Sequence, residues 1–261
     1  MQNNNGHAVK KTFALDFSHR AVIPYAHDYR HGEHEHWHTH PCDQLIHTLS
    51  GVIRVETQQG MWIVPPGRGV WIPAQVSHAL RIDGEVQARG VFVEPLARAD
   101  LPVVCQVVRV SDLLRALILN ALELPQAYQA GSRAERIYEL ILDEIRLMNT
   151  LPFCLPEPSS ARLKQLCDAV RRDPAGEWTL ENAARQVNMS GRTLSRHFYQ
   201  QTGLQFSEWL RRARLLEALT RLAQGEPVTQ VALECGYANP SAFSAMFRRV
   251  MGVPPGDYFT S

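Results

Sequence analysis

A pattern that occurs twice near the C-terminal end most constrains the fold of this 261-residue chain. The first copy covers residues 179–203 and the second covers residues 228–252, so corresponding positions lie 49 residues apart. Each copy has the periodicity of a short helix, a tight turn and a second helix. The small residues Ala183 and Ala232 let the two helices of each copy cross closely. The sequence therefore predicts two helix-turn-helix units.

The predicted helices begin and end at residues with a capping preference. Ser190 and Asn239 precede the second helices of the two copies, and both side chains are good helix N-caps. Between the copies, residues 206–224 predict one longer helix that begins at Ser207. Its apolar stripe comprises Trp209, Leu210, Ala213, Leu216 and Leu219. Such a rigid connector can present both second helices to one face of DNA, where successive major-groove segments lie about 34 Å apart.

Charge is distributed unevenly along the chain. The whole sequence has 27 Lys or Arg and 26 Asp or Glu, whereas residues 159–261 have 13 and nine. Most basic residues are arginines, whose planar fork suits phosphate and guanine. The five cysteines are scattered and form no CxxC pair, which argues against a structural zinc site and a disulfide framework. No apolar run suits a signal peptide or a membrane span, so we expect a soluble, cytoplasmic protein.

The first half of the chain has a different pattern. From about residue 21 to residue 110, short β-branched runs alternate with turn signals, which predicts an antiparallel barrel or double-sheet roll. The expected turns are Ser50-Gly51, Gln58-Gln59-Gly60, Pro65-Pro66-Gly67 and Asp83-Gly84. Helical periodicity follows Ser111, a predicted N-cap. A second helix, over residues 132–149, either packs on the β domain or forms a homodimer interface. Its apolar stripe is Ile137, Leu140, Ile141, Ile145 and Met148.

Prolines separate these two halves. Pro152, Pro156 and Pro158 oppose regular structure, so residues 150–160 are predicted to be a semi-rigid linker. We therefore expect a β-rich domain with two C-terminal helices over residues 1–149, the linker, and an all-α domain over residues 161–261.

The most specific stretch of the C-terminal half is VTQVALECGYANPSAFSAMFRRVMGVPPGDY, residues 228–258. Its diagnostic residues are Gly236-Tyr237, Phe243, Phe247, Gly252, Pro255 and Tyr258. With them, residues 161–258 resemble the AraC/XylS family of bacterial transcription regulators. The resemblance implies double-stranded promoter DNA as a partner, and RNA polymerase as a further partner if the protein is an activator.

The resemblance places the base-reading positions of the first unit on the second helix of that unit. They are Arg192, Ser195 and Arg196, with Thr193 beside them. Arginine can contact guanine O6 and N7 with two hydrogen bonds, so Arg192 and Arg196 are the stronger candidates.

In the second unit the corresponding positions carry small residues. They are Asn239, Ser241, Ser244 and Ala245. Many relatives have arginine at the position of Ala245, so we expect this helix mainly to hold the DNA backbone, aided by Arg248 and the helix N-terminus. Solvated helix faces are expected for Arg211, Arg212, Arg214 and Arg249.

Residues 38–51 and 60–80 resemble the two sequence motifs of cupin domains, which implies a sensor domain. On a strand, His38 and His40 point to the same face, Gln44 keeps that parity, and His78 can complete the site from a later strand. Trp62 and Trp71 are candidate walls of the effector pocket. The His-rich run at residues 31–36 is expected to be a solvated loop, and His47 a strand residue.

Two kinds of ligand fit this pattern. His38, His40 and His78 can together bind a divalent ion such as iron, nickel, manganese or zinc. Enzymatic cupins usually have glutamate where this chain has Gln44, and a neutral amide is a poorer ligand for a hard cation. Regulatory members of the family commonly bind an organic effector without metal.

These observations predict an α+β two-domain protein: a cupin-like antiparallel β-barrel followed by helices, then an all-α domain with two helix-turn-helix motifs. We interpret it as a sequence-specific DNA-binding transcription regulator, a homodimer and not an enzyme, whose cupin-like domain senses a small-molecule effector. The alternatives are a metal-responsive regulator and a cupin enzyme fused to a DNA-binding module.

Overall fold

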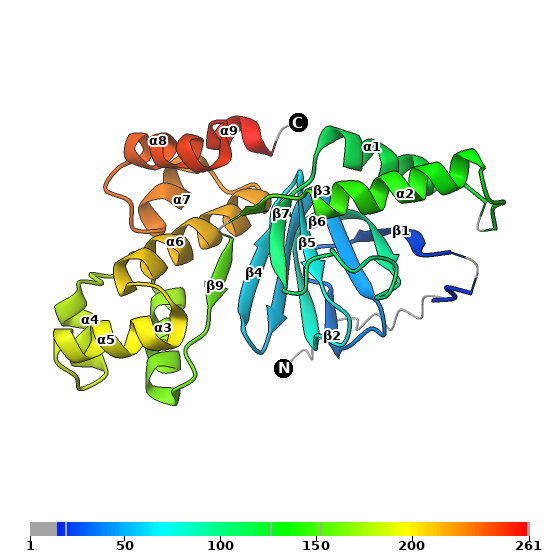
Figure 1. The fold of residues 1–261 in the computed structure, drawn as a ribbon. Helices are drawn as coiled ribbons and strands as arrows, with labels where there is room; N and C mark the ends of the chain where they lie inside the picture. The colour runs from blue at the N-terminus through cyan, green and yellow to red at the C-terminus, as the bar shows by residue number, and fades with distance from the viewer. Residues whose placement is uncertain (1–14, 19, 126, 152, 260–261) are drawn as a thin grey trace, which may run out of the picture. The chain divides into compact units, whose positions relative to one another are not determined.

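The computed structural model describes residues 15–18, 20–125, 127–151 and 153–259, which form two compact units (Figure 1). The β unit contains the described residues up to Thr57 and those from Trp62 to Leu151. The helical unit contains Gln58–Met61 and the described residues from Phe153 onward. None of the described helices is long and apolar enough to cross a membrane.

An antiparallel sheet forms the body of the β unit. Its strands are β1 (Val22–Tyr29), β2 (His34–His38), β3 (Asp43–Thr57), β4 (Gly60–Val64), β5 (Arg68–Ile72), β6 (His78–Val93), β7 (Gln106–Arg109) and β8 (Thr150–Leu151). The strand order is β1-β6-β3-β5-β7-β8, with β2 beside β6 and β4 beside β3. Side chains alternate across a sheet, so Gln44 and Phe92, which pair in register, lie on one face, the inner face. Leu45 and its partner Trp71 lie on the outer face.

Two of the expected turns are bends inside long strands. β3 continues through Ser50-Gly51 and β6 through Asp83-Gly84. Gly51 and Gly84 have φ values of 66° and 78°, and the pairing of β3 with β6 shifts register around Ser50. A glycine at positive φ forms a bulge, which bends a strand without ending it. The predicted turns at these two sites are therefore wrong, whereas the turns at Gln58-Gln59 and Pro66-Gly67 are present.

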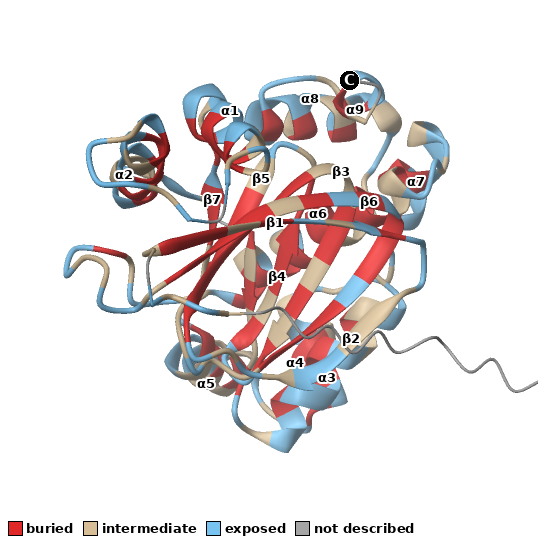
Figure 2. Cartoon of the chain, turned by 90° about the vertical axis from the view of Figure 1, so that its right-hand side faces the viewer, coloured by how far each residue is buried: buried red, intermediate tan, exposed pale blue. Residues whose placement is uncertain are grey.

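The outer face carries two helices, α1 (Asp112–Ala121) and α2 (Arg133–Arg146). Ser111 caps α1 as predicted, since its hydroxyl accepts a hydrogen bond from Leu114 N at 2.9 Å. Both helices bury one side in a cluster with Leu45 and Trp71, and Figure 2 shows that their other sides are exposed. Leu140 does not belong to the buried stripe: it follows buried Tyr138 by about 200° of helical rotation and is 44% exposed.

The helical unit contains both predicted helix-turn-helix motifs. Its elements are β9 (Cys154–Pro156), α3 (Ala161–Arg172), α4 (Leu180–Gln186), α5 (Gly191–Thr202), α6 (Phe206–Ala223), α7 (Val228–Glu234), α8 (Pro240–Met251) and α9 (Pro255–Tyr258). α4–α5 and α7–α8 are the two motifs, and α6 is the connector. Ser190 and Asn239 cap α5 and α8 as predicted. α6 begins one residue before Ser207, and its predicted apolar stripe is buried.

The expectation that residues 150–160 lack regular structure is wrong, because β8 and β9 lie within them. β9 packs against α6, where Trp209 Nε1 donates a hydrogen bond to Pro156 O at 2.9 Å. Leu155 is buried in the same strand. Proline is tolerated at strand ends and edges, where its missing N–H leaves no partner unpaired. Residues 153–158 therefore belong to the helical unit rather than to a spacer.

Candidate functional site

Three histidines converge on the inner face of the β unit. His38 ends β2, His78 begins β6, and the two residues pair in register. His40 follows β2 by two residues, and its ring contacts Phe92 with centroids 5.2 Å apart. One ligand nitrogen from each histidine lies within 4.8 Å of the other two. The structure thus brings together the three histidines singled out in the sequence, which we call the histidine cluster.

Backbone carbonyls set the proton positions of two rings in the cluster. His38 Nδ1 donates to His36 O at 2.7 Å, and His78 Nδ1 donates to Val76 O at 2.9 Å. Because a carbonyl only accepts, each Nδ1 carries a proton and each Nε2 is directed elsewhere. His78 Nε2 is buried and has no hydrogen-bond partner among the described residues. Histidines that bind metal commonly make this kind of second bond, which fixes the ring.

Burial dominates the electrostatics of the cluster. Burial, together with the neighbouring imidazoles, lowers the pKa of His40 and of His78 to about 4 each. Both rings are therefore neutral near pH 7. A neutral imidazole is the form that binds a metal ion or accepts a hydrogen bond from a ligand.

Glu35 is a site residue that the sequence analysis missed. β2 shifts register between Glu35, which pairs with Leu80, and His38, which pairs with His78. Leu80 and His78 lie two apart on β6, so their partners Glu35 and His38 share a face although three positions separate them. Glu35 Oε1 accepts a hydrogen bond from Tyr29 OH at 2.6 Å, and its Oε2 lies 3.6 Å from His38 Nε2. The expected solvated loop at residues 31–36 is therefore wrong for residues 34–36, which belong to β2.

Gln44 lies near the cluster but is engaged elsewhere. Its side chain is buried on β3, and Nε2 donates to Tyr25 OH at 3.0 Å. Gln44 Oε1 is buried and has no hydrogen-bond partner in the described part of the chain. Phe92, directly opposite Gln44, contacts both Tyr25 and His40. One aromatic ring thus contacts both the tyrosine bound to the amide and a histidine of the cluster.

The two candidate wall residues have different positions. Trp62 is buried on β4, and its role in a pocket stays a prediction. Trp71 was expected in the same pocket, which is wrong: it lies on the outer face, inside the cluster beneath α1 and α2. Trp71 Nε1 donates to Pro102 O at 2.7 Å there. His47, also buried, donates from Nδ1 to Arg68 O and is a strand residue as expected.

In the first helix-turn-helix motif, α5 has one buried and one exposed side. Leu194 and Phe198 are buried, whereas Arg192 and Arg196 are exposed. Thr193 and Ser195 are half-buried; Ser195 Oγ donates to Gln205 Oε1 at 3.0 Å. The arginines are available to a ligand.

The second motif presents smaller groups. In α8, Phe243 and Phe247 are buried, and the exposed side carries Ser241, Ala245 and Arg248, with Ser244 half-buried. Asn239 Oδ1 accepts a hydrogen bond from Ala242 N at 2.8 Å, so this side chain already serves as a helix cap.

Arg214 was expected on a solvated face and instead joins the two motifs. From α6 its Nε donates to Pro174 O at 2.8 Å and its Nη2 donates to Gly176 O at 3.2 Å, in the loop before α4. A Cβ on Gly236, in the turn after α7, would lie 2.7 Å from Pro174 O and 2.8 Å from Arg214 Cζ. Arg212 forms an ion pair with Glu208, while Arg211 and Arg249 are exposed as expected.

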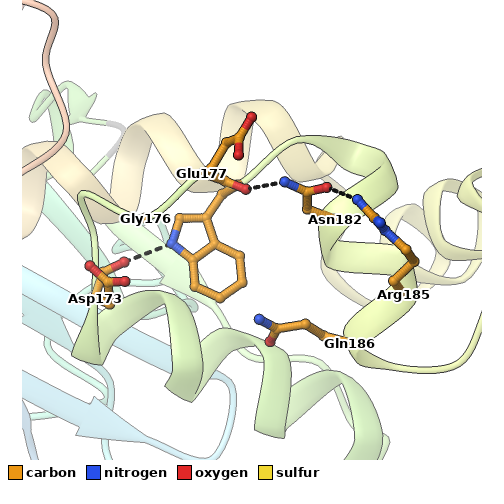
Figure 3. A pocket seen from close by; sticks show the side chains of 7 residues that line it. Asp173, Gly176, Glu177, Asn182, Arg185 and Gln186 are labelled. Atoms are coloured by element: carbon orange, nitrogen blue, oxygen red, sulfur yellow. Dashed lines mark hydrogen bonds between the residues drawn. The ribbon is translucent and has the colours of Figure 1, made fainter.

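The loop that Arg214 contacts borders an open hollow of about 420 Å³ (Figure 3). Its polar groups bond to one another: Trp178 Nε1 donates to Asp173 O at 2.6 Å, and Asn182 Nδ2 donates to Glu177 O at 2.8 Å. These bonds fix the loop against the start of α4. We therefore interpret the hollow as part of the structural contact between this loop and the start of α4.

Comparison with known proteins separates the same two regions. Residues 27–94 match the family model described as cupin domain, and residues 183–261 match the one described as helix-turn-helix domain. The regulator NimR of Escherichia coli K12, an HTH-type transcriptional regulator, is 31% identical over 221 residues, which cover 85% of this chain and 81% of NimR. A putative AraC-like transcription regulator of Streptomyces lividans is 38% identical over 90 residues, 34% of this chain and 30% of that protein. The chain belongs to the AraC/XylS family of transcription regulators.

Other relatives and solved structures cover different shares of the chain. The transcriptional activator RhaS of Klebsiella pneumoniae is 39% identical over 100 residues, 38% of this chain and 36% of RhaS. The solved structure of ToxT from Vibrio cholerae covers 92% of this chain and 98% of its own at 11% identity, with a TM-score of 0.39. The family and the fold class predicted from the sequence are confirmed, and this AraC/XylS protein is a DNA-binding transcription regulator with a cupin domain.

Proposed function

We propose that the histidine cluster is the sensor site of this regulator and that its occupancy controls promoter binding by the helical unit. The observation that carries the proposal is the convergence of His38, His40 and His78 around a buried, unpartnered Nε2 of His78. A buried polar atom without a partner is costly, so evolution retains one where a ligand will satisfy it. Gln44 Oε1, also unpartnered, supplies a second acceptor for the effector.

Promoter recognition in this proposal is divided between the two motifs. Arg192 and Arg196 of α5 read guanine edges in one major-groove segment, with Thr193 and Ser195 beside them. α8 binds the next segment mainly through the backbone, using Asn239, Ser241, Ser244 and Arg248. The exposure of both arginines on α5 and the small residues on α8 support this division.

Coupling between sensor and promoter follows from population shift. An effector that binds one arrangement of the chain more tightly than another stabilises that arrangement by its difference in affinity. The same difference must appear as a change in DNA affinity, since coupling between two sites is reciprocal.

The experiment begins with genome-wide mapping of bound sites and a reporter fused to a mapped promoter. The double variant H40A/H78A is expected to lose the effector response while its DNA affinity without effector stays within about twofold of wild type. The matched control is His47→Ala, which removes another buried histidine of the β unit, on the outer face, and is expected to keep the response. A normal response in the double variant would place the sensor elsewhere.

A metal-responsive regulator is the second candidate, because the cluster fits a divalent ion: neutral imidazoles, two of them oriented by backbone carbonyls. His38, His40 and His78 would hold the ion, which would supply charge to attract an effector or act as the signal itself. Metal analysis of the purified protein separates the two candidates. Stoichiometric iron together with substrate turnover would instead identify a cupin enzyme, a function that we do not expect among relatives described as regulators.

Assembly and location complete the proposal. α1 and α2 expose Leu113 and Leu140, which supports a homodimer formed through these helices. Sedimentation of wild type and of a Leu113→Asp variant tests it, with loss of the dimer expected.

RNA polymerase is a partner if the protein activates transcription, and promoter binding implies a cytoplasmic location.

A further inference from the structure

We propose that Tyr199 binds a DNA phosphate through its hydroxyl group and thereby anchors the first helix-turn-helix motif on the DNA backbone. The inference rests on the proposed placement of α5 in the major groove. It goes beyond that proposal, which gives α5 only residues that read bases and the side chains beside them, and gives Tyr199 no role.

Tyr199 lies on the exposed side of α5. It follows Arg192 by seven residues, or about 700° of helical rotation, so the two side chains point within about 20° of each other. Arg196 lies one turn before Tyr199 and is also exposed. The other side of the helix carries Leu194 and Phe198, which are buried. Tyr199 is therefore presented to the same ligand as the two arginines.

Contacts within the chain do not explain why an aromatic ring is placed there. Phe198, one position earlier, packs against Phe206 and Trp209, whereas Tyr199 is 53% exposed. The backbone carbonyl of Tyr199 accepts a hydrogen bond from Gly203 N at 2.8 Å, but its hydroxyl has no partner among the described residues. A tyrosine with a free polar tip is typical of a binding surface.

The internal repeat is an independent observation that points to the DNA backbone. Tyr199 corresponds to Arg248, 49 residues later, and both are exposed in the last turns of helices of equal length. The reading positions that carry Arg192 and Arg196 in α5 carry Ser241 and Ala245 in α8. Arginine and small polar or apolar groups thus exchange places between the two motifs. The position that holds the backbone through arginine in α8 has a neutral hydroxyl in α5.

Distance along the helix favours a phosphate over a base. The N-terminal residues of a recognition helix contact base edges, as proposed for Arg192. Tyr199 lies about 10.5 Å further along the helix axis, and the major groove is about 12 Å wide. A side chain at that position is near the edge of the groove, where the phosphates are. Tyrosine hydroxyls are among the groups that bind phosphate oxygens.

A neutral contact has a characteristic salt dependence. An arginine that neutralises a phosphate releases counterions, so each such contact steepens the fall of DNA affinity with salt. A hydroxyl strengthens binding without releasing counterions. Loss of the Tyr199 contact should therefore lower the affinity and leave the salt dependence unchanged.

The test uses the full-length protein in gel-shift titrations on the mapped promoter site and on a mutated site, at several salt concentrations. Tyr199→Phe removes the hydroxyl and keeps the ring. We expect it to bind both sites about tenfold more weakly with an unchanged salt slope. The matched control is Gln200→Ala, which changes the exposed neighbour on α5 and should stay within about twofold of wild type.

Two further measurements identify the phosphate. Tyr199→Arg gives the first motif the residue of the second, so it should bind at least as tightly as wild type and steepen the salt slope by about one unit. Single phosphates of the mapped site are also replaced by neutral methylphosphonates. At one position the replacement should weaken wild type about tenfold and leave Tyr199→Phe unchanged.

Three results would overturn the proposal: wild-type affinity in Tyr199→Phe, a loss confined to the mapped site, or an unchanged salt slope in Tyr199→Arg. Thermal unfolding checks that each variant is folded, and the exposure of Tyr199 predicts unchanged stability. The proposed function fails separately. If Arg196→Ala keeps full discrimination between sites while Tyr199→Phe weakens binding to both, the base-reading assignment is lost and this inference stands.

Discussion

The two helix-turn-helix motifs have the same framework but differ in their turns and in their exposed side chains. The second helices α5 and α8 begin at Gly191 and Pro240, 49 residues apart, whereas the first helices begin at Leu180 and Val228, 48 residues apart. The first turn uses Asn188 at a φ of 50°, and the second uses Gly236 at 79°. The two motifs therefore have helices of equal length, and the turn of the second motif is one residue longer.

The reason lies in where each turn packs. Asn188 is exposed, and asparagine tolerates the left-handed conformation. Gly236 lies against Pro174 O and Arg214, where no other residue type fits. One turn is free to change its sequence, and the other is fixed by its neighbours.

The largest expected effect tests whether the hydrophobic cores of the two helix-turn-helix motifs are equally important for stability. Phe198 and Phe247 occupy matching, fully buried positions, so Phe198→Ala and Phe247→Ala should each lower the free energy of unfolding by about 3–5 kcal/mol. Urea titration followed by circular dichroism measures this. A cost below about 1 kcal/mol at either site would show that the cores differ.

The next prediction sharpens the contrast between the turns. Gly236→Ala forces a positive φ on alanine and pushes its Cβ against a backbone oxygen, so we expect a loss of about 2–3 kcal/mol. Gly203→Ala is the control, because Gly203 has a φ of 71° with open space around it and should lose only about 1 kcal/mol. Equal losses would mean that the close approach to Arg214 does not matter.

The division of labour between α5 and α8 can be broken with two arginine variants. Arg196→Ala should reduce discrimination between the mapped site and a mutated site by about 1–3 kcal/mol. Arg248→Ala should weaken binding to both sites alike and lower the salt dependence by about one unit of slope. Gel-shift titrations at several salt concentrations distinguish these patterns. Proportional losses in both variants would contradict our assignment of α5.

The smallest expected effect concerns the caps. Ser190→Ala and Asn239→Ala each remove one side-chain acceptor from the first turn of a second helix, at a cost of about 1 kcal/mol of stability. Thermal unfolding provides the measurement, with exposed Ser241→Ala as the control. A negligible loss for Asn239→Ala alone would indicate that Pro240 suffices to start α8.

The helical unit was predictable because its signals are local. Caps such as Ser190 and the 3.6-residue periodicity of α6 act within one helix, so they hold whatever surrounds them. By contrast, local sequence signals do not decide which face of a β strand is covered by other elements. Alternation predicts that Trp71 and Ile72 lie on opposite faces, but only pairing with Leu45 decides which face is covered by α1 and α2.

The candidate site shows the same limit. His38, His40 and His78 were found from their spacing and their resemblance to cupin motifs. Glu35 was not, because a register shift resets the two-residue period and leaves no mark in the sequence. β9 was missed for a related reason: its prolines indicate a linker, and only the contact of Pro156 with Trp209 makes the segment part of the helical unit.

The contact of Arg214 with Pro174, Gly176 and the turn at Gly236 has a consequence for the promoter. A side chain that ties the flanks of both motifs to one connector fixes the distance between the two motifs. Two recognition boxes must then lie on the same side of the double helix, one turn of about 10.5 base pairs apart. Inserting half a turn of DNA between the boxes moves one box to the opposite side of the double helix, where the motifs cannot reach it. Promoters of this regulator should therefore tolerate base substitutions within a box better than changes in the spacing between the boxes.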